Sequence, residues 1–178
     1  NMYTRLSFTG FTLFELLITI CILTMITLFA IPSYQHLKAR QEAKNTIYQL
    51  DSLIRQNRIE AMSRHQDLVI CSSQDGKNCA TGQWNHYLLT YSDQNHNRLL
   101  DTQEAILSTI TLQLKYGALS LRNALHRNII TFKAENGLPQ GYMGSFHYCS
   151  QYDTALDQKI VINMMGNSRI ERRSCLIP

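Results

Sequence analysis

The chain has 178 residues, of which 44% are hydrophobic and 17% are charged, and its formal net charge at pH 7 is +4. This length suits one globular domain beside an anchor and is short for two domains. The small net charge says little about partners, so the positions of the charged residues are more informative than their sum.

The longest apolar stretch covers residues 11–31 and contains a single charged side chain, Glu15. At about 1.5 Å per residue, a helix of this length crosses a hydrocarbon core of about 30 Å. Because a carboxylate inside an apolar helix is costly without a partner, Glu15 is predicted to be functional. The alternative is that Glu15 only favours the positive end of the helix dipole.

A polar leader, residues 1–10, precedes the apolar stretch and contains one cation, Arg5, and no acid. This bias places the leader in the cytoplasm and the residues after the apolar stretch outside it. A secretory signal peptide would have a small-residue cleavage site after its apolar run. Here Ile31 and Pro32 lead directly into a helical pattern, so the apolar segment is expected to be retained.

The run Gly10-Phe-Thr-Leu-Phe-Glu15, followed by the apolar stretch, resembles the class III signal of type IV pilins and type II secretion pseudopilins. The resemblance implies that a prepilin peptidase cleaves after Gly10 and methylates the new amino group of Phe11. It also implies that Glu15 meets the Phe11 amine of a neighbouring subunit during assembly. The implied partners are the prepilin peptidase, the inner membrane and other major and minor pilins.

After Pro32 the pattern becomes amphipathic, with apolar residues at steps of three or four. These residues are Tyr34, Leu37, Ala43, Ile47, Leu50, Ile54 and Ala61. A continuous helix from Phe11 to about Arg64 would be roughly 80 Å long. Since a membrane needs far less, the second half is expected to lie against a globular domain.

From Asp67 onward the period approaches two, and β-branched and aromatic residues gather in short runs. Strands are predicted near residues 68–72, 84–92, 105–114, 129–133, 145–149, 159–164 and 168–172. The predicted class is α+β, with a long N-terminal helix packed on an antiparallel β-sheet domain. The predicted parts are the leader 1–10, a transmembrane and assembly helix 11–31, its amphipathic continuation 32–64, and a periplasmic β-rich domain 65–178.

Five cysteines are present, and Cys21 lies inside the apolar stretch, where it acts as a small apolar residue. The other four are Cys71, Cys79, Cys149 and Cys175. An even number in an exported domain predicts two disulfides. Three connectivities are possible, and we prefer the pairs 71 with 79 and 149 with 175, because the first closes a short loop and the second pins the C-terminal tail. A zinc site is the competing interpretation, but no CxxC spacing supports it.

The β region sharpens the resemblance. Its features are the cysteines, Trp84, the run Tyr91-Ser-Asp93 before an Asn/Asp-rich loop, the runs Ile130-Thr-Phe132 and Asn136-Gly137, and Gly166. Together they resemble the GspH/FimT/FimU branch of minor pilins and minor pseudopilins, over nearly the whole chain after the leader. The resemblance implies a type IV pilin fold.

The Asn/Asp-rich loop has side-chain oxygens at the ligand spacing of a calcium loop. The candidate ligands are Asp93, Asn95, Asn97, Asp101 and Glu104. Arg98 stands where the sharp turn of such a loop requires Gly, and strands rather than helices flank it. The interpretation we favour is a hairpin loop whose side chains cap backbone groups.

The C-terminal tail has three guanidinium groups within five residues, those of Arg169, Arg172 and Arg173, opposed only by Glu171. Such groups form charge-assisted contacts to phosphates. Some FimT-like pilins bind double-stranded DNA through a C-terminal Gly-Arg-x-Arg segment during natural transformation, and this tail is similar, although Asn167 follows Gly166 where Arg is expected. The alternative is an edge strand protected from aggregation by its charges.

No catalytic motif is present: there is no nucleophile elbow and no phosphate loop, and the six histidines are scattered. We therefore predict no enzyme activity and no cofactor. The expected function is that of a minor type IV pilin in pilus assembly or tip formation, with DNA uptake through the tail as an added role. The alternative is a GspH-like minor pseudopilin that primes a type II secretion pseudopilus.

Overall fold

The computed structural model describes residues 12–123, 128–140 and 144–175. The predicted cleavage and methylation sites, Gly10 and Phe11, lie outside these residues.

The chain divides into two compact units, Asn1–Leu37 and Lys38–Pro178. Helix α1 is Leu13–Arg64, and the elements after it are β1 Asp67–Ser73, β2 Tyr87–Asp93, β3 Ile106–Thr111, β4 Gly117–Asn123, β5 Ile129–Phe132, β6 Gly144–Ser150, the 3-10 helix η1 Thr154–Leu156, β7 Gln158–Ile162 and β8 Ser168–Arg172.

Helix α1 has a recognisable cap at each end. The Thr12 hydroxyl accepts a hydrogen bond from the Glu15 amide at 3.2 Å, which satisfies one of the unpaired donors of the first turn. The helix continues through Pro32 and stops after Arg64, where His65 adopts a left-handed φ of 55°. The Gln66 amide then bonds to the Ala61 carbonyl at 3.2 Å, so that the chain can turn into β1.

In the second unit, residues 38–64 of α1 bury one face at helical spacing. The buried residues are Ala39, Ala43, Thr46, Ile47, Leu50, Leu53, Ile54, Asn57 and Ala61. The amphipathic helix predicted from the sequence is therefore present, but its buried face begins at Ala39. Tyr34 and Leu37, which were expected to belong to it, are 58% and 61% exposed.

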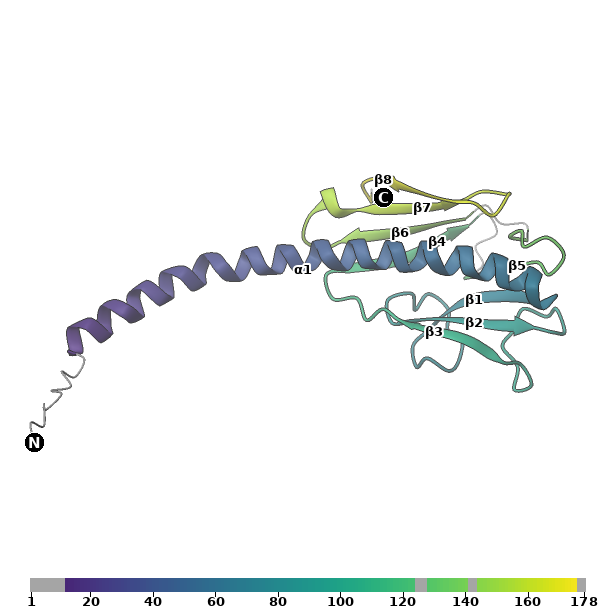
Figure 1. Ribbon diagram of the computed structural model, residues 1–178, viewed down its shortest axis with the longest axis horizontal. Helices are drawn as coiled ribbons and strands as arrows, with labels where there is room; N and C mark the ends of the chain where they lie inside the picture. The colour runs from purple at the N-terminus through teal and green to yellow at the C-terminus, as the bar shows by residue number, and fades with distance from the viewer. Residues whose placement is uncertain (1–11, 124–127, 141–143, 176–178) are drawn as a thin grey trace, which may run out of the picture. The chain divides into compact units, whose positions relative to one another are not determined.

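Eight strands form two antiparallel four-stranded sheets. The first has the order β3-β2-β1-β5 and the second has the order β4-β6-β7-β8. Residues 38–64 of α1 lie across both sheets (Figure 1). Their apolar face shares one core with Leu68, Ile70 and Phe132 of the first sheet and Phe146 and Ile160 of the second.

Trp84, which precedes β2, belongs to this core. It is 2% exposed, and its ring meets the edge of the Phe146 ring at a centroid distance of 5.1 Å. The predicted α+β class, with a long helix packed on antiparallel β-structure, is confirmed, and the β-structure is a pair of sheets. One face of the helix buries apolar residues of both sheets.

Two strand predictions were wrong. Strand β4 was missed, because Gly117, Ser120 and Arg122 interrupt its apolar residues and lower its β propensity, and pairing with β6 over seven residues outweighs that weakness. Trp84 was placed inside a strand, but β2 begins at Tyr87 and the Trp84 segment is a turn.

Candidate functional site: apolar helix, disulfide domain and basic tail

The apolar part of α1 presents large hydrophobic side chains on all sides. Leu13, Phe14 and Phe29 are 81%, 72% and 79% exposed within the chain. The segment is long and apolar enough to cross a membrane. An apolar surface of this extent in water is unfavourable, so it needs either lipid or other helices to cover it.

The threonines of this segment suit an apolar environment. The hydroxyls of Thr19, Thr24 and Thr27 each donate to the carbonyl three residues earlier, at 2.8, 2.8 and 2.9 Å. A hydroxyl satisfied within its own helix does not need water. The helix can therefore be buried in hydrocarbon without unpaired donors at these positions.

Glu15 lies in the first turn of α1, and its carboxylate is exposed. Thr12 and Glu15 have the spacing of a capping box, in which the acid stands three residues after the capping hydroxyl. Among the residues that the structure describes, no cation forms an ion pair with this carboxylate.

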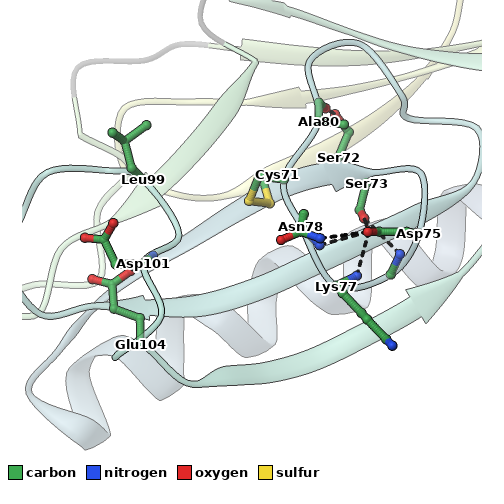
Figure 2. The surroundings of a disulfide bond; sticks show 12 residues. Cys71, Ser72, Ser73, Asp75, Lys77, Asn78, Ala80, Leu99, Asp101 and Glu104 are labelled. Atoms are coloured by element: carbon green, nitrogen blue, oxygen red, sulfur yellow. Dashed lines mark hydrogen bonds between the residues drawn. A yellow bond between two sulfur atoms is a disulfide. The ribbon is translucent and has the colours of Figure 1, made fainter.

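Both expected disulfides are formed, Cys71 with Cys79 and Cys149 with Cys175, and each has a Cα–Cα distance of 5.7 Å. The first ties the end of β1 to the loop after it. In that loop the Asp75 carboxylate accepts hydrogen bonds from Ser73, Lys77 and Asn78 (Figure 2). Hydrogen bonds from the Asn78 and Lys77 amides hold the pKa of Asp75 well below its usual range.

The Asn/Asp-rich loop uses its side-chain oxygens to hold its own backbone. Asp101 accepts from the Asn95 and Asn97 amide groups at 2.8 and 2.7 Å. Glu104 accepts from the backbone amides of Gln94 and Asp101 at 3.0 and 3.2 Å. These are the contacts of a capped hairpin loop.

Arg98 supplies a left-handed turn with a φ of 63°, although it is not glycine. Its amide bonds to Asp93 and its guanidinium donates to Gln140 at 3.0 Å. In the described part of the chain, no group of three or more His, Cys, Asp or Glu residues is placed to hold a metal ion. Calcium binding by this loop rests on the spacing of its oxygens alone, and the capped hairpin loop stays the interpretation that we favour.

A cavity of about 470 Å³ lies between the disulfide loop and the Asn/Asp-rich loop. Its lining includes the Cys71–Cys79 bond, Leu100, Ile129 and Tyr91, whose side chain is fully buried. Burial, with the carboxylates of Asp93, Glu104 and Asp101 nearby, raises the pKa of Tyr91. The walls come from five separate segments, so no local sequence pattern could reveal the cavity.

The basic tail is an edge strand. Among the strands that the structure describes, β8 pairs with β7 alone, and the guanidinium of Arg169 forms an ion pair with Glu171. This pairing with Arg169, aided by the charges of Lys159 and Arg173, lowers the pKa of Glu171. Arg169, Arg172 and Arg173 are all exposed. The fold therefore leaves the three arginines of the tail on the surface.

Asp157, which sequence reasoning missed, holds this tail in place. Its carboxylate is 3% exposed and accepts from the backbone amides of Ser150 and Cys175, both at 2.8 Å. Together with the Cys149–Cys175 disulfide, it fixes the end of the tail beside β6. No short motif marks this role, because the two amides lie 7 and 18 residues from Asp157 on opposite sides of it in sequence.

A long helix on two antiparallel sheets, with an apolar N-terminal segment, defines a pilin-like α+β protein. The family of the type II transport protein GspH matches residues 46–166. The chain belongs to the GspH family of minor pseudopilins, whose members are structural proteins and not enzymes. The family resemblance found in the sequence is thereby confirmed.

Solved structures agree at the level of the fold. The type IV minor pilin FimU of Pseudomonas aeruginosa strain PAO1 matches with a TM-score of 0.54 and 19% identity, over 74% of this chain and 90% of that chain. The same protein in another crystal form matches with a TM-score of 0.51 and 18% identity, over 72% and 91%. No curated protein matches the chain.

Proposed function

We propose that the chain is a minor type IV pilin that takes part in pilus assembly or tip formation. Cleavage after Gly10 would free the amine of Phe11 for methylation, and the apolar helix would then hold the subunit in the inner membrane with its C-terminal domain in the periplasm. Family membership and the exposed apolar surface of residues 13–31 support this proposal. The observation that carries it is Glu15, an acid in the first turn of that surface.

In this proposal Glu15 pairs with the Phe11 amine of a neighbouring subunit. A carboxylate and an ammonium group in an apolar layer each need a partner of opposite charge, since an isolated charge there is costly. The internal hydrogen bonds of Thr19, Thr24 and Thr27 leave Glu15 as the main polar group for which the layer has to provide. Pairing between subunits would also fix their relative register along the filament.

Mass spectrometry of the assembled subunit tests the processing step. The expected mass is that of a chain beginning at Phe11 with one additional methyl group. A subunit that retains residues 1–10 after assembly would contradict the proposal.

A gene deletion separates this function from its alternative. Loss of the chain should reduce piliation if it is a minor pilin that promotes assembly. The alternative is a type II secretion pseudopilin, which the name of the matching family favours, and its loss should instead block protein secretion while pili remain. Complementation with the intact gene is the control.

We also propose that the C-terminal tail binds double-stranded DNA for natural transformation. Three exposed guanidinium groups, Arg169, Arg172 and Arg173, support this role, and the Cys149–Cys175 bond ties the tail to the domain. Contacts to phosphates should give weak binding with little sequence preference that falls steeply with added salt. If the chain does not shift duplex DNA at low salt, the tail has no such role.

A further inference from the structure

The second sheet, β4-β6-β7-β8, has one face toward the core and one face outward. Side chains alternate along each strand, so every second residue shares a face. Leu119, Phe146, Tyr148, Ile160 and Ile162 are buried toward the core. The residues between them point outward, and these are mostly polar or charged.

The register of the strands groups the outward residues into two rows. The first row runs from Arg122 through Ser145 and Val161 to Arg169, and the second from Ser120 through His147 and Lys159 to Glu171. Arg173 follows β8 directly, two residues after Glu171. With neighbouring strands about 4.8 Å apart, the cations span roughly 15 Å across the sheet.

The cations of this outward face lie close enough to His147 to change its pKa. Partial burial and the cations Arg122, Lys159 and Arg173 lower the pKa of His147 below its usual value of 6.5. These cations come from three different segments, β4, β7 and the residues after β8, and they converge on one histidine of β6. Glu171 is the only acid in the two rows, and it is already paired with Arg169.

Arg172 belongs to the opposite face. It pairs with Gln158 of β7, and Gln158 lies on the same face of that strand as the buried Ile160 and Ile162. The three arginines of the tail are therefore not one group. Arg169 and Arg173 share the outward face with Lys159 and Arg122, whereas Arg172 points to the helix side of the sheet edge.

We propose that this outward surface, the cationic face formed by Arg122, Lys159, Arg169 and Arg173 around His147, binds the phosphate backbone of nucleic acid. The inference rests on the proposed DNA binding and assigns it to the sheet rather than to the tail alone. A spread of cations from β4 across to β8 and the residue after it fits an extended row of phosphates better than a single phosphate group. Val161 is the one large apolar side chain in the two rows, so the face lacks the apolar residues that insert into a membrane surface.

His147 adds a pH dependence to this surface. The groups that face it are Ser145, whose hydroxyl lies 2.9 Å from Nε2, Ser120 and Arg122 of β4, Lys159 of β7, and Glu171 and Arg173 of the tail. Without ligand, partial burial and the neighbouring cations disfavour the imidazolium. A bound phosphate offsets their repulsion and favours the imidazolium, so nucleic acid should bind more tightly in mildly acidic solution than at neutral pH.

The test measures binding of the full chain, in neutral detergent, to a fluorescent 30-base-pair duplex over a range of salt concentrations. The double variant Arg122→Gln/Lys159→Gln lies outside the tail and should weaken binding about ten-fold at low salt, with the slope of log K against log salt falling by about 2. The matched control, Arg40→Gln/Lys44→Gln on the exposed side of α1, removes the same charge and should change binding by less than about two-fold.

Three results would overturn the inference, and they differ in whether the proposed DNA binding by the tail also fails. If Arg122→Gln/Lys159→Gln binds as the parent does while the three tail arginines changed to Gln do not bind, the tail alone is the site and the proposed DNA binding stands. If the parent does not bind duplex DNA at low salt, both proposals are wrong. If the double variant loses binding to phosphatidylglycerol vesicles but not to DNA, the face is a membrane contact.

The histidine is tested separately with His147→Gln. The parent should bind several-fold more tightly at pH 5.5 than at pH 7.5, and the variant should lose most of that gain while its affinity at pH 7.5 is unchanged. Equal gains in the parent and the variant would show that other groups cause the pH dependence. Melting temperatures of all variants establish that the fold is kept.

Discussion

The Tyr148 hydroxyl donates a 2.9 Å hydrogen bond to the Glu42 carboxylate, which joins the middle of the second sheet to helix α1. Glu42 also accepts from the backbone amides of Lys115 and Tyr116 at 2.8 and 3.0 Å. Burial and the bond to Glu42 raise the pKa of Tyr148. Glu42 thus connects the helix, the segment before β4 and strand β6.

Replacing Glu42 with Gln should destabilise the domain by about 1–3 kcal/mol, because one of its oxygens becomes an amide donor that faces other donors. Thermal or chemical unfolding of the detergent-solubilised chain measures the effect. The control is Glu60→Gln, which removes only an exposed pair with Arg64 and should cost less than about 0.5 kcal/mol. Equal stability of the two variants would contradict the role assigned to Glu42.

Gly117 should not tolerate a side chain. A Cβ there would overlap the Tyr148 ring and lie 2.9 Å from the Cys149 carbonyl oxygen. Gly117→Ala is therefore expected to lower the free energy of unfolding by about 1–3 kcal/mol. Gly144→Ala, on the paired strand, meets its neighbours only at 3.5 Å or more and should be close to neutral. A neutral Gly117→Ala would show that Tyr148 can move away.

The lowered pKa of Asp67 indicates how the stability of the domain should change in acid. Burial acts to raise its pKa, but hydrogen bonds from Lys133 at 2.6 Å and the Ala134 amide at 2.8 Å outweigh burial and lower it. A lowered pKa in the folded state gives stability that is present above the unfolded value of about 3.9 and is lost as the pH falls through the folded value. Unfolding midpoints should therefore drop below about pH 4.

Asp67→Asn should be less stable at neutral pH and should lose part of this acid sensitivity. Guanidinium titrations between pH 2 and 7 compare the two chains. If the variant and the parent lose stability in parallel below pH 4, Asp67 does not control the acid response.

The two disulfides should contribute unequally to the free energy of unfolding. The entropy of loop closure gives about 3.5 kcal/mol for the separation of 26 residues between Cys149 and Cys175, and about 2.5 kcal/mol for the separation of 8 between Cys71 and Cys79. Double serine variants of each pair, unfolded in denaturant, test this order. A larger loss for the Cys71 and Cys79 pair would show that the Asp75 loop depends on its disulfide more than chain entropy implies.

The sequence was most informative where one segment carries the whole signal. The apolar run with its single acid at position 15 predicted the first half of α1, and the change from helical spacing to alternation predicted the α+β class. The even number of cysteines after the apolar run predicted the two disulfides. Strand β4 and the division into two sheets could not, because Gly117–Asn123 becomes a strand only through its pairing with β6.

The candidate site shows the same limit. The tail arginines were visible as a run, but their separation onto two faces of a sheet depends on the register between β7 and β8. Likewise, Lys159 and Arg122 are unremarkable in the sequence and approach His147 only through strand pairing. Glu42 and Asp157 were missed because each binds amides distant in sequence.

The most direct test of the account is whether Glu15 is required for incorporation into pili. Glu15→Ala should still insert into the membrane but should be absent or strongly reduced in pili sheared from cells, since the apolar layer would then hold an unpaired amine. Thr12→Val removes the capping hydroxyl and keeps the acid, so it should be incorporated normally. Normal incorporation of Glu15→Ala would contradict the assembly role, and equal loss for both variants would assign Glu15 to capping the helix.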